Sequence, residues 1–187
     1  MSKQSDNLFY QTTGKAEEHN MDEYVTRVAT PEDAPPVEDL LKTSYPVLMA
    51  GAYDEATLAP LLALITKANM TLLTSGTYHV AETRDGSLVG CGGWTIEKPP
   101  GVDGVAGDAG HLRHFATHPD WTRRGIGRAI YRQCEAAARS ARVATLEVCS
   151  SLNGEPFYAA QGFERIQSIS VAIGPYSFPG VLMRRVI

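Results

Sequence analysis

The chain has 187 residues, enough for one domain with a proper hydrophobic core. Hydrophobic residues make up 43% and charged residues 20%, a balance that argues against an intrinsically disordered chain and a membrane-embedded one. The formal net charge of −4 disfavours nucleic acid as a partner, because duplex-binding modules normally carry a basic surplus. No apolar run approaches the roughly 20 residues that span a bilayer, so we expect no membrane partner.

The three cysteines, Cys91, Cys134 and Cys149, are odd in number and lack the pairwise spacing of a metal site. Each lies among apolar residues, so we predict buried, reduced thiols, a cytoplasmic protein and no metal. Residues 1–20 are polar, mixed in charge and without an apolar signal core. We therefore predict a flexible N-terminal tail, followed by a single domain over residues 21–187.

The first half of the chain predicts a strand, two helices and a hairpin. Residues 24–29 contain β-formers, and a helix start follows, with a hydroxyl cap at Thr30 and a proline next to it. Leucines at helical spacing predict a second helix over residues 58–68, whose first turn would hold Pro60. Residues 78–96 contain two strand patterns separated by an Asp-Gly turn, which is typical of a β-hairpin.

The second half predicts alternating strands and helices. The glycine- and proline-rich residues 98–110 indicate a loop. After it we expect strands at 111–117, 143–149, 163–173 and 181–186, a helix at 125–141 and a short helix at 155–161. Strand–helix–strand in the middle implies a parallel pair, and the hairpins at each end imply antiparallel neighbours. The fold class is thus α/β (α+β), with a mixed sheet.

The segment between the strand at 111–117 and the following helix has the composition of an anion site. Gly125 and Gly127 allow a close approach of backbone to ligand, and the first N–H groups of a helix point outward. Arg123, Arg124 and Arg128 add positive charge that suits a diphosphate. A plain glycine-rich helix start with solvated arginines is the alternative. The segment is no Walker loop and no dinucleotide fingerprint, because Gly-Lys-Ser/Thr and the third glycine are both missing.

At these residues the sequence resembles the GNAT superfamily of N-acetyltransferases. That family's pyrophosphate signature, Gln/Arg-x-x-Gly-x-Gly/Ala at a helix start, is similar to residues 122–127, with Thr122 at the usual Gln/Arg position. A second signature is similar to Asn153, followed by Phe157-Tyr158 and Gly162-Phe163. The resemblance covers residues 24–187 in order, and residues 90–94 look like the family's third strand.

The resemblance implies a GNAT fold, with a mostly antiparallel sheet of about seven strands flanked by helices and a splayed central parallel pair. It implies acetyl-CoA as co-substrate and an amine of a small molecule or peptide as acceptor. The cofactor-binding residues it implies are Phe115, Ala116, Thr117, Arg123, Arg124, Gly125, Ile126, Gly127, Arg128, Asn153 and Tyr158. A homodimer is compatible with this reading.

The resemblance also assigns the chemistry. Tyr158 is implied as the proton donor to the departing thiolate, because a phenol stays protonated at neutral pH. His111 stands where some family members carry a catalytic glutamate, and it is our candidate general base. His114, His79, Glu147 and Glu97 are the other candidates for that role.

Two other functions stay open at this point. A GNAT-like domain could sense acyl-CoA without turnover, or the acceptor could be a lysine or the N-terminus of a protein. Tyr158 argues against the sensor, whereas Thr122 leaves it open.

Overall fold

The computed structural model describes residues 23–102 and 104–187, so the predicted tail at 1–20 lies outside the described residues. Seven strands form one sheet in the order β1-β2-β3-β4-β5-β7-β6, which confirms the mixed α/β fold predicted from the sequence. The strands are β1 (Tyr24–Val28), β2 (Tyr78–Thr83), β3 (Leu88–Thr95), β4 (Gly110–Thr117), β5 (Thr145–Ser151), β6 (Glu164–Ile173) and β7 (Tyr176–Val186). The helices are α2 (Ala34–Met49), α3 (Glu55–Ile65), α4 (Met70–Leu73), α5 (Ile126–Ser140) and α6 (Glu155–Ala160), with short 3-10 turns at Pro31–Asp33 and Pro119–Trp121.

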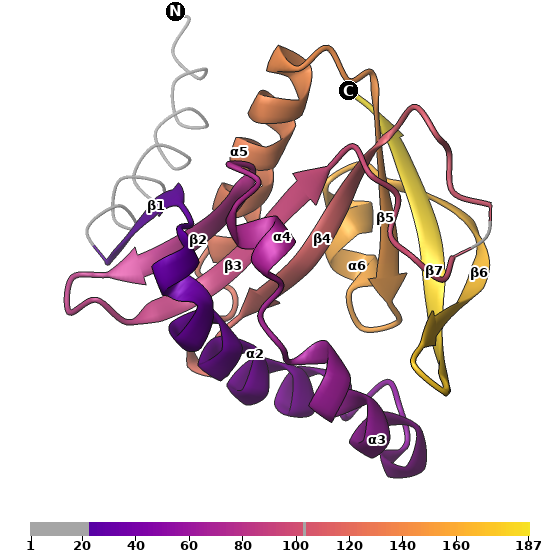
Figure 1. Cartoon of the computed structure of the whole chain (residues 1–187), viewed down its shortest axis with the longest axis horizontal. Coiled ribbons are helices and arrows are strands. Elements are labelled where there is room, and N and C mark those ends of the chain that lie inside the picture. Colours follow the sequence, from indigo (N-terminus) through magenta and orange to yellow (C-terminus); the bar gives the residue numbers. More distant parts are fainter. Residues whose placement is uncertain (1–22, 103) are drawn as a thin grey trace, which may run out of the picture.

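The sheet is antiparallel except between β4 and β5. This parallel ladder joins only Gly110–Leu112 to residues 146–148. Figure 1 shows the two strands diverging toward their C-terminal ends. The predicted splayed pair is therefore present.

Helices cover both faces of the sheet. Ile126, Ile130 and Cys134 of α5 pack on one face with Leu112 and Leu146. Gly90 of β3 permits this contact, since a Cβ there would lie 2.3 Å from the Cγ2 of Ile126. On the opposite face α2 packs against β3 and β4, and α3 contacts β7 (Figure 1).

Three element predictions needed correction. Helix α3 begins at Glu55 because Asp54 caps it, accepting a hydrogen bond from the Thr57 amide at 2.7 Å, so Pro60 lies inside the helix and not in its first turn. The short helix α4 was not predicted. Strand β7 begins at Tyr176, five residues earlier than predicted, and it contains Pro179. The proline is tolerated there because the ladder between β5 and β7 ends at Gly180, so Pro179 has no partner on the β5 side.

The cysteine prediction is also only partly right. Cys91 and Cys134 are buried and Cys149 is partly exposed, and all three thiols are free. Within residues 23–102 and 104–187, no cluster of His, Cys, Asp or Glu could hold a metal ion. No helix in the same ranges is both long and apolar enough to cross a membrane.

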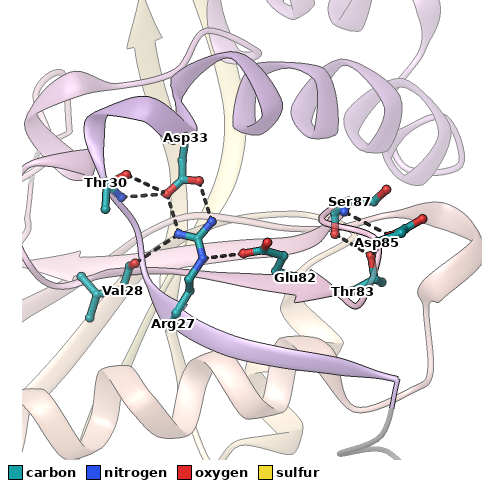
Figure 2. Close-up of polar contacts among 8 residues, drawn as sticks. All are labelled: Arg27, Val28, Thr30, Asp33, Glu82, Thr83, Asp85 and Ser87. Carbon is teal, nitrogen blue, oxygen red and sulfur yellow. Dashed lines mark hydrogen bonds and ion pairs between the residues drawn. The ribbon is translucent and has the colours of Figure 1, made fainter.

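A cluster of charges ties β1 and β2 to the start of α2 (Figure 2). The Arg27 guanidinium donates to both carboxylate oxygens of Asp33, at 2.7 and 2.8 Å, and to Glu82 at 2.5 Å. Asp33 also accepts the Thr30 amide at 2.8 Å, which completes a capping box. The hydrogen bond from Arg27 is the largest cause that lowers the pKa of Asp33.

We expect Asp33→Asn to lower the free energy of unfolding by about 1.5–3 kcal/mol at pH 7, the usual range for a hydrogen bond to a charged group. The pKa of Asp33 is lower in the folded protein than in the unfolded chain. Its contribution to stability is therefore complete above the pKa of the unfolded chain and is lost as the pH falls through the pKa of the folded protein. Urea unfolding of both proteins from pH 7 to pH 3 should show the difference narrowing below about pH 4. Asp39→Asn, at an exposed position of α2, is the control and should change stability by less than about 0.5 kcal/mol. A difference that stays constant with pH would contradict this account.

Candidate active site

A cleft of about 1050 Å³ opens where β4 and β5 diverge. Its walls come from α2, α3, the loop after β3, the start of α5, α6 and the β6–β7 hairpin. The predicted site residues that line it are Phe115, Ala116, Thr117, Arg123, Gly125, Ile126, Gly127, Arg128, Asn153 and Tyr158. The structure thus brings together residues from β4, α5 and α6 and from the loops that precede the two helices, which the sequence linked only through the resemblance.

The floor of the cleft is an open sheet edge. Beyond Leu112, β4 has no ladder partner on the β5 side, while Ala116 and Thr117 still pair with β3 on the other side. A bulge lies between, where the ladder between β3 and β4 shifts register and His114 takes a left-handed conformation with φ 51°. Such a conformation is unusual for a residue other than glycine and marks a site held in place by its surroundings. The edge therefore offers backbone hydrogen-bonding groups to an extended ligand.

The start of α5 forms a second part of the cleft. Arg123 and Gly125 both have positive φ, 64° and 82°, which turns the chain sharply into the helix. The first intrahelical bond runs from Ala129 to Gly125 at 2.9 Å, so the amides before it have no partner within the helix. In the described chain, Arg123 and Arg128 are exposed to the cleft without an ion-pair partner. This combination suits an anion.

Arg124 does not line the cleft. Its guanidinium lies 3.3 Å from Glu23 and stacks over the Trp121 ring, 4.6 Å from the centroid. Thr122, at the family's usual Gln/Arg position, uses its hydroxyl locally and donates to the Pro119 carbonyl at 3.0 Å. Positive charge in this part of the cleft therefore comes from Arg123 and Arg128.

Tyr158 contributes a phenol to the cleft from α6. Its buried ring packs edge-on against Phe115, Phe157 and Phe163, with centroids 5.0 to 6.0 Å apart. Burial strongly raises its pKa, so the hydroxyl keeps its proton at neutral pH. The hydroxyl forms no hydrogen bond to any other described residue. A fixed ring with an available O–H is what a proton donor requires.

Asn153 also lines the cleft, from the turn between β5 and α6. Asn153 does not cap the helix that follows it. The N-cap is Gly154, and no side-chain cap bond is present. The Asn153 amide is therefore left exposed at the cleft wall.

His111 lies outside the cleft lining. It is buried, with its Nδ1 3.8 Å from Glu147, and its buried Nε2 has no hydrogen-bond partner among the residues that the structure describes. Glu147 accepts hydrogen bonds from Arg184 at 2.6 and 2.8 Å and from the Ala106 amide at 2.9 Å. Burial is the main reason that the pKa of His111 is lowered. The geometry does not bring these two candidate bases to the cleft, and His79 and Glu97 do not line it either.

Three residues that do line the cleft received no role or only a minor one in the sequence analysis. Tyr45 of α2 is a second phenol in the cleft. Burial is the main cause that raises the pKa of Tyr45, and the nearby Tyr158 also contributes to raising it. His114 lines the cleft at the bulge, and burial lowers its pKa to about 4. Arg113 is the third. Arg113 could have been found from the sequence, because a charged residue in the middle of a central strand is unusual. Tyr45 could not, because its position in a helix does not distinguish it from an ordinary core residue.

The comparisons with known proteins agree with this architecture. A family model described as an acetyltransferase (GNAT) domain matches residues 53–175. No curated protein sequence gives a significant match. Among solved structures, a GCN5-related N-acetyltransferase from Rhodopseudomonas palustris is 23% identical with a TM-score of 0.72, covering 88% of this chain and 96% of its own.

Two further solved structures share the fold at lower identity. The PaiA N-acetyltransferase of Thermoplasma acidophilum, in complex with coenzyme A, is 15% identical with a TM-score of 0.66 and covers 88% of this chain and 99% of its own. A mosquito arylalkylamine N-acetyltransferase-like protein is 13% identical with a TM-score of 0.59 and covers 88% and 100%. At such identities these structures establish the fold alone, while the family model spans well over half of the chain. The chain therefore belongs to the GNAT acetyltransferases.

Proposed function

We propose that this protein transfers the acetyl group of acetyl-CoA to a primary amine of a small molecule or peptide. The observation that carries the proposal is the joint presence, in one cleft, of an anion-suited helix start, an open sheet edge and a protonated phenol. Membership of the GNAT family supports acyl transfer, and the neighbour crystallised with coenzyme A supports acyl-CoA as the donor.

The cofactor would bind in two parts. Its pyrophosphate would lie at the start of α5, against the free amides near Gly127 and the charges of Arg123 and Arg128. Its pantetheine arm would pair with the open edge of β4 at Phe115–Thr117, as an added strand. This arrangement would bring the thioester into the gap between the strands, beside Tyr158.

The reaction is direct attack. The amine nitrogen bonds to the thioester carbonyl carbon, and the resulting tetrahedral intermediate carries the negative charge on oxygen. When it collapses, the C–S bond breaks and the sulfur leaves with the electron pair. The nitrogen, which became positively charged in the attack, loses a proton to solvent, so that a neutral amide forms. Tyr158 donates its proton to the sulfur and regains one from solvent.

The attacking amine must be neutral, and the cleft favours that form. Among the described residues, no aspartate or glutamate lines the cleft, so no carboxylate stabilises an ammonium ion there. Arg113 adds a positive charge, which also favours the neutral amine. We propose that the amine releases its proton to water and that His111, buried outside the cleft, takes no direct part.

The first test of the proposal is an amine panel with acetyl-CoA, in which released CoA is detected by its thiol. Turnover of any amine separates an enzyme from an acyl-CoA sensor, and the accepted amines separate small-molecule from protein acceptors. Tight CoA binding without turnover of small amines, peptides or protein lysines would favour the sensor.

The arginines of the cleft give a prediction about the cofactor. Arg123→Ala and Arg128→Ala should each weaken CoA binding about 5- to 10-fold at low salt, since an exposed charged contact contributes roughly 1 kcal/mol. The loss should shrink at higher ionic strength, because salt screens exposed charges. Arg124→Ala is the matched control and should change the affinity less than about twofold, because Arg124 faces Glu23 and Trp121. Calorimetry that ranks Arg124 above the other two would place the phosphates elsewhere.

Tyr158→Phe keeps the ring and removes the proton. We expect kcat to fall about 100-fold, the lower end for loss of a general acid, because thiolate is a fair leaving group. The affinity for CoA should stay within about threefold, since the ring packing is retained.

Tyr131→Phe controls for the loss of a buried phenol. Tyr131 also packs against Phe163, but its hydroxyl bonds to Arg185 and does not line the cleft. Equal turnover of wild type and Tyr158→Phe at saturating acetyl-CoA would show that Tyr158 only packs.

The pH profile distinguishes water from His111 as the proton acceptor. If the amine releases its proton to water, log kcat/KM should rise with pH up to the pKa of the amine used, and His111→Ala should keep that profile. Two accepted amines of different basicity should give different midpoints. A midpoint below 6.5 that is the same for both amines and disappears in His111→Ala would identify His111 as the base, because burial lowers its pKa.

A further inference from the structure

Arg113 is a cation inside the cleft that has no anionic partner among the described residues. It is partly buried on β4, between the end of the β5 ladder and the bulge. Its hydrogen bond to a described residue is long, 3.5 Å from Nη1 to the Thr95 hydroxyl, and it forms no ion pair in the part of the chain that the structure describes. Burial is the main cause that lowers its pKa. A guanidinium withdrawn from water in this way is normally compensated by a carboxylate.

The nearby carboxylates do not fill that role. Glu147 is taken by Arg184 and the Ala106 amide. Glu97 contributes to raising the pKa of Arg113 but forms no ion pair with it. The charge of Arg113 is therefore open to the cleft.

Arg113 faces away from the proposed phosphate site. Leu112 packs with α5, and successive strand residues point to opposite faces, so Arg113 points to the face that α2 and α3 cover. The hydrogen bond to Thr95 supports this orientation of Arg113. Trp94 packs on the α5 side of the sheet, so the next residue, Thr95, points to the opposite face. The phosphates of the cofactor would be served by Arg123 and Arg128 at the start of α5. Arg113 is therefore available to bind the second substrate, which is the amine acceptor.

The walls around this face of the cleft are mostly apolar. They include Leu48 and Met49 from α2, Ile65 from α3, and Val171 and Phe178 from the β6–β7 hairpin. A site with apolar walls and one guanidinium fits a ligand with an apolar body and one carboxylate.

We propose that Arg113 binds the carboxylate of the acceptor, and that the acceptor is an apolar amino acid or a close analogue. This inference rests on the proposed amine acetylation. A guanidinium can hold a carboxylate through two parallel hydrogen bonds, which fixes the position of the adjacent amine. The same positive charge favours the neutral, nucleophilic form of that amine.

The test uses two pairs of acceptors with the same apolar side chain, L-phenylalanine against L-phenylalaninamide and L-leucine against L-leucinamide. Because the amine of an amino-acid amide is less basic than that of the free acid, kcat/KM is expressed per neutral amine. The wild type should prefer the carboxylate member by about 10- to 100-fold in kcat/KM, the range for hydrogen bonds to a charged group. Arg113→Gln should abolish this preference, mainly through KM, and leave the affinity for CoA unchanged. Arg113→Lys should retain part of it. Arg139→Gln, at an exposed position of α5, is the control and should behave as wild type.

A binding measurement makes the test independent of turnover. With CoA-loaded protein, calorimetry should show N-acetyl-L-phenylalanine binding at least about tenfold more tightly than its amide, and Arg113→Gln should remove the difference. If this preference is found but no amine is acetylated, the proposed reaction fails and the carboxylate site stands. Equal use or binding of acid and amide by the wild type, an unchanged preference in Arg113→Gln, or no binding of either ligand would overturn the inference.

Discussion

The functional cleft depends on how briefly β4 and β5 pair. Two parallel strands in the middle of a sheet would normally share a full ladder, yet only three residues of each strand do so here. The remaining backbone of β4 on that side is left for a ligand, and the aromatic residues of α6 lie beside the opening. A longer ladder would close the cleft and bury the groups that make it useful. The incomplete hydrogen-bond ladder between β4 and β5 is therefore what makes the cleft possible.

Two glycines and one strained residue hold this opening in shape. Gly92 leaves room for the Phe115 ring, since a Cβ at Gly92 would lie 2.7 Å from that ring. Gly90 lets α5 approach β3, which places the start of the helix at the edge of the cleft. Between these contacts the chain bulges at His114, whose positive φ is maintained by the surrounding packing. The bulge changes the direction of β4 just where it stops pairing with β5.

The sequence was sufficient for the fold and for much of the cleft because the informative signals were local. Glycines at a helix start, an Asp-Gly turn and strand periodicity predicted elements, and the resemblance supplied the seven-stranded arrangement. Prediction from the sequence failed at positions where contacts between distant parts of the chain determine the structure. Pro60 is tolerated inside α3, and Pro179 lies where β7 has no partner on one side. Arg124 and Arg123 are adjacent in sequence, yet only the structure shows that Arg124 turns to Glu23 and Trp121.

The same distinction applies to the ionisable residues of β4. His111 and Arg113 are two residues apart and share a face of the sheet, so periodicity treats them alike. The structure separates them, because the β5 ladder still covers His111, which lies beside Glu147, and ends before Arg113. A histidine beside an ion pair in the closed part of the sheet has little access to a substrate. An arginine one step into the open part has access to the cleft, and its charge is not neutralised by the described chain. The point at which β4 and β5 part therefore decides which of these side chains can take part in recognition.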